Sequence, residues 1–252
     1  MRGGDRDRVG SLEKGLAVIA AFSASCPRLT LAEAARKTGL TRATVRRHLL
    51  TLVALGFAES DGRHYWLTPR VLRLGYAYLS STPLPKIAQP VLDEIGERTK
   101  EVASLAILDG TEVVFLGHSS TRRLVAASTS VGLRLPAYCT ALGRAILAHR
   151  PEADVERFLA NVEPRRFTPH TKIAPDEIRA AIARARSLGY SVSDEELEIG
   201  LRSIAIPVAN SRNQVQLGLA VSLHAAHMTG EEMIRDILPE LRAGREVLET
   251  ML

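Results

Sequence analysis

The strongest constraint on the fold is a pair of short helix signals near the N-terminus, separated by only three residues. "TLAE" at Thr30–Glu33 has the spacing of a capping box, in which the threonine and glutamate side chains each satisfy a free backbone amide. The helix that it opens, Leu31–Thr38, is followed by Gly39, a residue type favoured in the left-handed conformation past a helix end. Thr41 then caps the next helix. Two helices joined by such a tight glycine turn are typical of a helix-turn-helix.

The helix after Thr41 has two contrasting faces. At 100° per residue the apolar residues gather on one side, and small, hydroxyl and arginine side chains gather on the other. The apolar face comprises Val45, Leu49, Leu52 and Val53, and the opposite face comprises Ala43, Thr44, Arg47 and Thr51. A pair of arginines taken alone is more often a solvated surface, but arginine also binds guanine in bidentate fashion. We predict that Arg47 and Thr44 face the DNA groove, while His48 lies near the buried side.

Two further signals complete a winged helix-turn-helix over residues 11–68. An amphipathic helix is expected at Ser11–Phe22, behind a disordered tail at 1–10. Phe57–Glu59 and His64–Leu67 are extended runs joined around Asp61-Gly62, a strong hairpin signal, and a hairpin at this place is the wing. The predicted DNA-binding residues are Thr30, Thr41, Arg42, Thr44, Arg46, Arg47, Arg63 and His64.

The distribution of charge agrees with this interpretation. Residues 1–68 contain 11 Lys and Arg against 6 Asp and Glu, whereas residues 69–252 contain 22 of each. All of the formal net charge of +5 therefore lies in the first quarter of the chain. Such an asymmetry is expected of a small nucleic-acid-binding module joined to a neutral domain.

Residues 69–84 resemble a linker helix, stopped by Pro83 and Pro85. Its apolar residues are too many for one buried stripe, and pairing with a second copy of the chain is a natural way to bury them. These residues are Val71, Leu72, Leu74, Tyr76, Tyr78 and Leu79.

Residues 85–252 alternate between strand and helix patterns. The hairpin signal Asp109-Gly110 lies inside the apolar stretch Val102–Ser120. Further strands are expected at Leu124–Ser128, Tyr190–Ser193, Ser203–Ala209 and Gln214–Leu223, and helices at Ile87–Thr99, Thr140–His149, Glu152–Asn161, Pro175–Leu188 and Thr229–Leu252. An antiparallel sheet flanked by helices would make the whole chain an α+β protein with a sensor-like second domain.

No catalytic or metal-binding motif is visible in that second domain. The chain has no GxSxG, P-loop, GxGxxG or HExxH pattern, and His224 and His227 have no third ligand beside them. Cys139 has no evident base partner, and the acidic run Ser193–Gly200 is most simply a solvated turn. We therefore expect no catalytic residue, no metal, no cofactor and no enzymatic activity.

The cellular location follows from what the sequence lacks. No apolar run approaches the length of a membrane span, and the N-terminus has no apolar signal region. The two cysteines, Cys26 and Cys139, give no disulfide framework. We expect a cytoplasmic protein without a membrane partner.

The chain resembles IclR-type transcriptional regulators over nearly its whole length. The matching pieces are "SLEKGLAVIAAF", the helix-turn-helix "LTLAEAARKTGLTRATVRRHLLTL", the linker, "LPAYCTALGRAILA" at Leu135–Ala148 and "EIGLRSIAIPV" at Glu198–Val208. The linker and the first effector-domain motif look most like the branch that regulates β-ketoadipate-pathway and aromatic-acid catabolism (PcaR/PcaU/PobR type). The resemblance implies a winged helix and a GAF-like effector domain. It also implies binding to palindromic, double-stranded promoter DNA and assembly as a homodimer or a dimer of dimers.

The resemblance also implies an effector cleft over the sheet. Carried over by position, its wall includes Tyr138, Cys139 and Thr140 from the first motif, and Asp194, Ser203 and Ser222 from the later strands. Ala220 stands where relatives often have a serine. Independently, an aromatic or dicarboxylic acid needs an apolar slot and a few donors. Arg134 could pair with such a carboxylate or lie on the surface.

Three functions remain open from the sequence. The first is a DNA-binding regulator controlled by a small acid of aromatic catabolism, such as protocatechuate, para-hydroxybenzoate or β-ketoadipate. The second is the same regulator with a different small carboxylate, such as glyoxylate or pyruvate. The third is an enzyme that acts on a small acid in the C-terminal domain.

Overall fold

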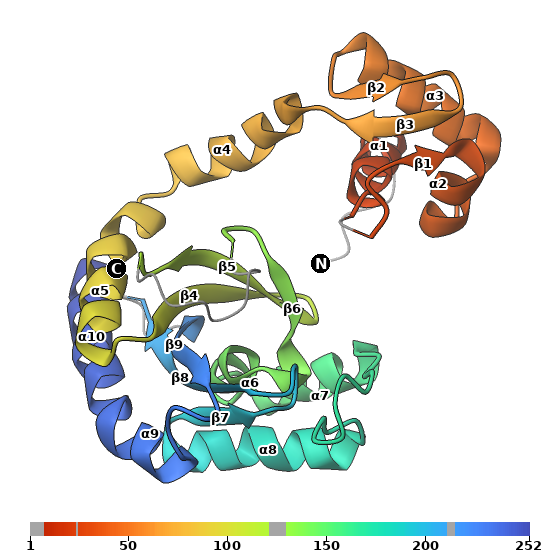
Figure 1. Ribbon diagram of the computed structural model, residues 1–252. Helices are drawn as coiled ribbons and strands as arrows, with labels where there is room; N and C mark the ends of the chain where they lie inside the picture. Colours follow the sequence, from red (N-terminus) through yellow and green to blue (C-terminus); the bar gives the residue numbers. More distant parts are fainter. Residues whose placement is uncertain (1–7, 24, 121–129, 211–214) are drawn as a thin grey trace. The chain divides into compact units, whose positions relative to one another are not determined.

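The computed structural model describes residues 8–23, 25–120, 130–210 and 215–252. The chain divides into two compact units, Met1–Ser81 (the N-terminal unit) and Thr82–Leu252 (the C-terminal unit) (Figure 1). The predicted strand Leu124–Ser128 and most of the predicted tail at 1–10 lie outside the described residues.

The N-terminal unit is a winged helix-turn-helix, as predicted. Its elements are α1 (Gly10–Ala20), β1 (Leu29–Thr30), α2 (Leu31–Thr38), α3 (Arg42–Ala54), β2 (Ala58–Ser60), β3 (His64–Leu67), the 3₁₀ turn η2 (Pro69–Val71) and α4 (Leu72–Ser81). The capping box forms: the Glu33 amide donates to the Thr30 hydroxyl at 3.3 Å, and the Thr30 amide donates to the Glu33 carboxylate at 2.8 Å. Gly39 ends α2 with φ +69°, a left-handed conformation that glycine adopts without strain.

The wing is a small antiparallel sheet with the strand order β1-β3-β2. Its turn is built by Asp61, whose carboxylate accepts hydrogen bonds from the amides of Arg63 (2.9 Å) and His64 (2.7 Å). These bonds to the ionised form lower the pKa of Asp61 to about 2. Val45 and Leu49 are buried in the core beneath, as expected for the inward face of α3, and Tyr65 of β3 is buried with them.

Over its described residues, the C-terminal unit forms one six-stranded antiparallel sheet with the order β6-β5-β4-β9-β8-β7. Its elements are α5 (Leu84–Thr99), β4 (Val102–Asp109), β5 (Glu112–His118), β6 (Arg134–Pro136), the 3₁₀ turn η3 (Ala137–Cys139), α6 (Ala141–Leu147), α7 (Glu152–Asn161), α8 (Pro175–Leu188), β7 (Ser191–Asp194), β8 (Leu201–Ala209), β9 (Val215–His224), α9 (Gly230–Asp236) and α10 (Leu238–Met251). The predicted α+β architecture is therefore confirmed.

The sheet of the C-terminal unit separates two apolar cores. Because successive strand residues point to opposite faces, Ile204, Ile206 and Val208 pack with α5 and α10, whereas Ala205 packs with α6, α7 and α8. Figure 1 shows α5 and α10 side by side on one side of this sheet and α6 and α8 on the other. The face toward α6 is the one that carries small and hydroxyl side chains, and this makes room for a cavity.

The main differences from the sequence predictions lie in three parts of the C-terminal unit. α5 begins at Leu84 rather than Ile87, because Pro85 fits the first helical turn, where its missing amide has no partner to lose. The single helix expected at Thr229–Leu252 is two helices, α9 and α10, since Pro239 starts a new helix after Ile237. The strand β6 and the turn η3 were not predicted, because each spans only three residues.

None of the helices in the described part of the chain is long and apolar enough to cross a membrane.

Candidate functional site

α3 presents a basic surface to solvent. Arg42, Arg46 and Arg47 are exposed, and no ion pair involving them is found among the described residues. The helix is fixed by its buried Val45 and Leu49. Unpaired guanidinium groups on a rigid helix are available to phosphates and to guanine edges.

The threonines predicted to bind DNA have mainly local roles in this structure. Thr41 caps α3, and its hydroxyl lies 2.9 Å from the Thr44 hydroxyl, both at the exposed start of the helix. The Thr30 hydroxyl donates to Glu33 at 2.8 Å within the capping box and is half-buried. The structure thus places Thr41 and Thr44 beside the arginines, while Thr30 sits one helix earlier.

The wing carries the remaining predicted contacts. Arg63 is exposed at the hairpin tip, beside Gly62 with φ +92°. The ring of His64 lies 3.4 Å from the Asp61 carboxylate and is less exposed than Arg63. Of the two, Arg63 is therefore the freer side chain for a phosphate contact.

A groove runs between α1 and α3. It is lined on the α3 side by Thr44, Arg47, His48 and Thr51, and on the α1 side by Lys14 and Gly15 among others. His48 is half-buried there and lies close to α1: a Cβ placed on Gly15 would be 3.7 Å from the Nδ1 atom of its ring. His48 therefore packs toward α1, in keeping with the sequence prediction, whereas Arg46 lies outside the groove.

The C-terminal unit contains a mostly apolar cavity of about 210 Å³ on the α6 face of the sheet. Its lining residues are Val102, Phe115, Leu133, Leu135, Cys139, Thr140, Ala141, Leu142, Ser193, Leu197, Glu198, Leu201, Ser203, Ala220 and Ser222. None of these described lining residues is a lysine or an arginine. A negatively charged ligand would depend on hydroxyl and backbone donors there.

The hydroxyl groups of the cavity come from neighbouring elements. Ser203 and Ser222 are directly opposite each other in the β8–β9 ladder, and their hydroxyls lie 2.8 Å apart. Thr140 donates to the Pro136 carbonyl at 3.1 Å, and Ser193 donates to the Cys139 carbonyl at 2.8 Å. Thr140 and Ser193 thus donate to backbone carbonyls, whereas Ser203 and Ser222 bond to each other. The hydroxyls of Ser203 and Ser222 can therefore rotate toward a ligand.

The structure brings together five of the eight predicted effector-binding residues. Cys139, Thr140, Ser203, Ala220 and Ser222 line the cavity. Arg134, Tyr138 and Asp194 do not. Arg134 is bound on the surface by Asp109 (2.9 Å) and Glu112 (2.7 Å), and Asp194 by Arg202 (2.8 Å). The Tyr138 hydroxyl turns away and donates to the Arg165 carbonyl at 2.6 Å.

Most of the apolar lining was not predicted. Phe115, Leu133, Leu135, Leu142 and Leu197 come from four different parts of the chain. The only signal in the sequence is the alternation that places Ser203, Ala205, Ala220 and Ser222 on one sheet face with Phe115. Leu133 and Leu135 depend on β6, which is too short to recognise.

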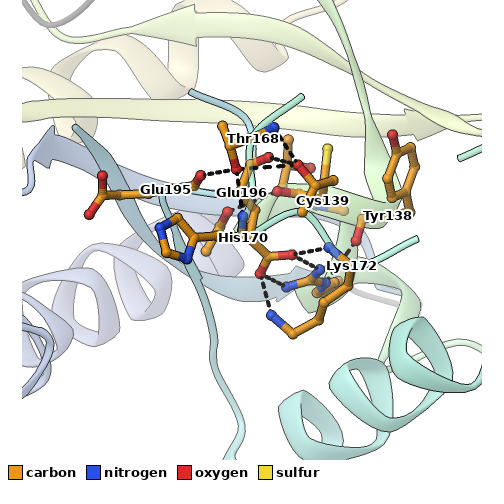
Figure 2. A network of polar contacts seen from close by, with 12 residues as sticks. Tyr138, Cys139, Thr168, His170, Lys172, Glu195 and Glu196 are labelled. Atoms are coloured by element: carbon orange, nitrogen blue, oxygen red, sulfur yellow. Dashed lines mark hydrogen bonds and ion pairs between the residues drawn. The ribbon is translucent and has the colours of Figure 1, made fainter. Parts of the chain in front are cut away.

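One prediction about the acidic run Ser193–Gly200 is wrong. Glu196 is not solvated: it is 2 % exposed and paired with Arg144, itself 1 % exposed. Both Arg144 amino groups donate to the Glu196 carboxylate at 2.6 Å, and the Lys172 ammonium donates at 2.9 Å. Figure 2 shows Glu196 and Lys172 beside Tyr138 and Cys139 in this polar network. Burial raises the pKa of Glu196, but the bonds from Arg144 and Lys172 outweigh it, so the pKa is lowered and the carboxylate stays ionised.

Cys139 is buried in the apolar core beside the cavity. Burial raises the pKa of its thiol from 9.0 to about 12, so the reactive thiolate is scarce at neutral pH. The described residues contain no group of three or more His, Cys, Asp or Glu side chains that could hold a metal ion.

Two family models match the chain. Residues 11–62 match the IclR helix-turn-helix domain, and residues 76–248 match the bacterial transcriptional regulator IclR C-terminal domain. The two matches cover the N-terminal winged helix and the unit that contains the cavity.

Individual relatives extend this similarity over almost the whole chain. The Pca regulon regulatory protein of Pseudomonas putida is 44% identical over 241 residues, covering 95% of this chain and 83% of that protein. The p-hydroxybenzoate hydroxylase transcriptional activator of Acinetobacter baylyi is 33% identical over 241 residues, 94% of this chain and 89% of its own. The crystal structure of an IclR homologue from Microbacterium hydrocarbonoxydans complexed with 4-hydroxybenzoate is 25% identical, with a TM-score of 0.75, and covers 95% of this chain and 98% of that chain.

Proposed function

The chain belongs to the IclR family of bacterial transcriptional regulators, and we propose that it controls genes of aromatic-acid catabolism in response to a small aromatic acid bound in the cavity of its C-terminal unit. Relatives of this family are named as regulators and not as enzymes, so the enzyme hypothesis is set aside. The observation that carries the proposal is the cavity itself, joined in one chain to a basic recognition helix.

The size and lining of the cavity favour a single aromatic ring. A cavity of roughly 150 Å³ lined by Leu, Ile and Phe is large enough to hold benzene. The present cavity, about 210 Å³, has room for a ring with small substituents. Glyoxylate or pyruvate would leave apolar side chains such as Phe115 and Leu142 without a partner. The relative named as the p-hydroxybenzoate hydroxylase transcriptional activator and the complex with 4-hydroxybenzoate support the same ligand class.

The effector carboxylate is proposed to meet the Ser203–Ser222 pair. Within the described part of the chain these two hydroxyls share a hydrogen bond only with each other, and Thr140 and Cys139 line the same cavity. A hydrogen bond to a charged acceptor is stronger than one between neutral groups, so the serines gain by turning toward a carboxylate. Ala220, two residues before Ser222 on β9, lines the same cavity and adds no donor.

The DNA side of the proposal rests on α3 and the wing. Arg47 and Thr44 are proposed to contact bases, Arg42, Arg46 and Arg63 to contact phosphates, and His64 to support the wing tip. Thr30 and Thr41 are proposed to act indirectly, by capping α2 and α3. Each cap holds the start of its helix where the free backbone amides can meet a DNA phosphate. The partner is double-stranded promoter DNA.

We further propose that the protein acts as a homodimer joined through its N-terminal unit. α4 has no buried residue, and its Leu72 and Tyr76 side chains are 73% and 70% exposed. On α1, Leu12 and Leu16 are also exposed. A second copy of the chain would cover this apolar surface and supply the second recognition helix that a palindromic site needs.

Ligand binding is tested by thermal unfolding across a panel of acids. 4-Hydroxybenzoate, protocatechuate, glyoxylate and pyruvate are compared at equal concentrations. A ligand present at 100 times its Kd stabilises the folded protein by about 2.7 kcal/mol, and this raises the Tm. The proposal expects a shift from an aromatic acid and none from glyoxylate or pyruvate. The reverse pattern would establish the alternative effector class.

A further inference from the structure

A polar network lies behind the cavity wall and joins segments that are far apart in the sequence. Its centre is the bidentate pair between Arg144 on α6 and Glu196 in the loop between β7 and β8. Neither carboxylate oxygen is left open, since Lys172 donates from its ammonium at 2.9 Å and from its backbone amide at 3.3 Å. We call Arg144, Glu196 and Lys172 the clasp.

The clasp reaches the first wall of the cavity through Arg144. Its third donor, Nε, bonds the Tyr138 carbonyl at 2.8 Å, directly before Cys139 and Thr140. Gly143 keeps this wall close: a Cβ there would lie 2.2 Å from the Ala137 carbonyl oxygen. The position of Arg144 therefore determines the position of the wall formed by η3 and the start of α6.

The clasp reaches the second wall through Glu196. Leu197, Glu198 and Leu201, which line the cavity, follow it within five residues of the chain. The backbone around Glu196 is fixed as well: Thr171 donates to its carbonyl at 2.6 Å, and Thr168 donates to the Glu195 carbonyl at 2.7 Å. Figure 2 shows Thr168, Glu195 and Glu196 within this network.

Two features indicate that the clasp does more than stabilise the fold. A buried ion pair contributes little net stability, because removing two charges from water costs about as much as their attraction gains. Glu195 also adopts φ +54°, a left-handed conformation that is unfavourable for a residue other than glycine. Backbone strain of this kind persists where surrounding contacts enforce it and is concentrated at functional sites.

We propose that the Arg144–Glu196 pair is a positioning element of the effector cavity, holding the Cys139–Leu142 wall and the Leu197–Leu201 wall at the separation that an aromatic acid requires. Neither side chain lines the cavity; each acts through the backbone that it holds. The inference rests on the proposed function for its ligand, but the position of the wall has a readout of its own.

The test uses Glu196→Gln, which keeps the size of the side chain and removes its charge. The matched control is Leu241→Ala on α10, which opens the core on the other face of the sheet. Both variants are made in a Cys26→Ser background of the full chain, so that Cys139 is the only thiol. The rate of Cys139 alkylation, the Kd of 4-hydroxybenzoate by calorimetry and the free energy of unfolding in urea are measured for each.

Glu196→Gln is expected to raise the Kd of 4-hydroxybenzoate at least tenfold. Its rate of Cys139 alkylation is expected to exceed, at least tenfold, the rate calculated from its free energy of unfolding. Leu241→Ala is expected to change the alkylation rate only as far as its lost stability requires and to keep the parent Kd. An unchanged Kd in Glu196→Gln, or alkylation that follows global unfolding alone, overturns the inference.

Two results separate this inference from the proposed function. If the parent protein binds no acid of the panel, the proposed function fails, and the alkylation rate alone decides whether the clasp positions the wall. If Glu196→Gln does not fold, Arg144→Lys keeps the positive charge beside Glu196 but loses the bidentate contact and the bond from Nε to the Tyr138 carbonyl. That variant is expected to shift both readouts in the same direction by a smaller factor, and parent values would overturn the inference.

Discussion

Gly143 is the described glycine at which an added Cβ would lie closest to another atom. An added Cβ would lie 2.2 Å from the oxygen and 2.4 Å from the Cα of Ala137, both backbone atoms that cannot rotate away. Gly143→Ala is therefore expected to destabilise the protein by about 1–3 kcal/mol despite the better helix propensity of alanine. Urea unfolding followed by circular dichroism measures this loss.

The control for that substitution is Gly230→Ala. Gly230 opens α9, and no atom lies within 4 Å of the position of an added Cβ. Its effect is expected to stay within about 0.5 kcal/mol, as for other surface substitutions. Equal losses in the two variants would contradict the close approach of η3 to α6.

The two cysteines are expected to differ in reactivity. The pKa of Cys26 is lowered, chiefly by a hydrogen bond from Lys37, whereas burial raises the pKa of Cys139 to about 12. One thiol per chain is therefore expected to react with a disulfide reagent at pH 8, and the second only after unfolding. Rapid reaction of two thiols in the native protein would show that the cavity wall is open.

The raised pKa of Cys139 also has a consequence for stability. Above an unfolded pKa near 9.0 the unfolded chain loses the thiol proton while the folded chain keeps it up to about 12. The unfolded state then binds fewer protons, so stability falls as the pH rises from 9 to 12. Cys139→Ala is expected to remove this part of the pH dependence, as measured by urea unfolding at pH 8 and pH 10.5.

At the scale of elements, α3 and the wing are expected to contribute to DNA binding in different ways. Arg47 is exposed on the recognition helix, so Arg47→Ala is expected to cost about 1–3 kcal/mol on specific DNA and less on nonspecific DNA. Arg63 lies at the wing tip, so Arg63→Ala is expected to weaken both DNAs equally and to reduce the salt slope by about 1. Fluorescence anisotropy at several salt concentrations measures both effects.

Each of the two variants serves as the control for the other. If Arg47→Ala weakens specific and nonspecific binding by the same factor, Arg47 contacts only phosphates. The base-reading role would then pass to Thr44 or Arg46, and the proposed division of contacts on α3 would be wrong.

The elements that the sequence predicted best are those whose ends carry their own signals. Thr30 with Glu33, Gly39 and Thr41 fix the ends of α2 and α3 by local hydrogen bonds, which depend on nearby residues only. Pro175 does the same for α8. By contrast, β6 exists because it pairs with β5, and no property of its three residues alone requires a strand.

The cavity was predicted less completely for the same physical reason. Ser203 and Ser222 were identified through the resemblance. Arg134, by contrast, forms ion pairs with Asp109 on β4 and Glu112 on β5, and the sequence alone does not show that these carboxylates lie beside it. Glu196 resembled its three acidic neighbours, and only the fold brings Arg144, 52 residues away, into contact with it. Local sequence does not show which charged residues, far apart in the chain, will pair in the fold.

At the scale of the whole molecule, the central question is how many chains bind DNA together. Leu72→Glu combined with Tyr76→Glu places charges on the exposed apolar surface of α4. If a second copy covers this surface, the variant is expected to be a monomer in analytical ultracentrifugation at concentrations where the parent is a dimer. Its affinity for a palindromic site is expected to fall accordingly.

The matched control is Leu188→Glu, which changes an exposed leucine of α8 in the C-terminal unit. This control is expected to keep the dimer. A parent protein that sediments as a monomer at every concentration tested would contradict the proposed assembly.

The most direct test of the account is the affinity of the full chain for its promoter DNA with and without an aromatic acid. Fluorescence anisotropy of the labelled promoter is measured at rising concentrations of 4-hydroxybenzoate and of protocatechuate, for the parent and for Ala220→Leu, which fills part of the cavity. At least one acid is expected to change the Kd for DNA in the parent, and Ala220→Leu is expected to abolish that change. A Kd that is the same at every acid concentration, or one that shifts equally in Ala220→Leu, would contradict this expectation.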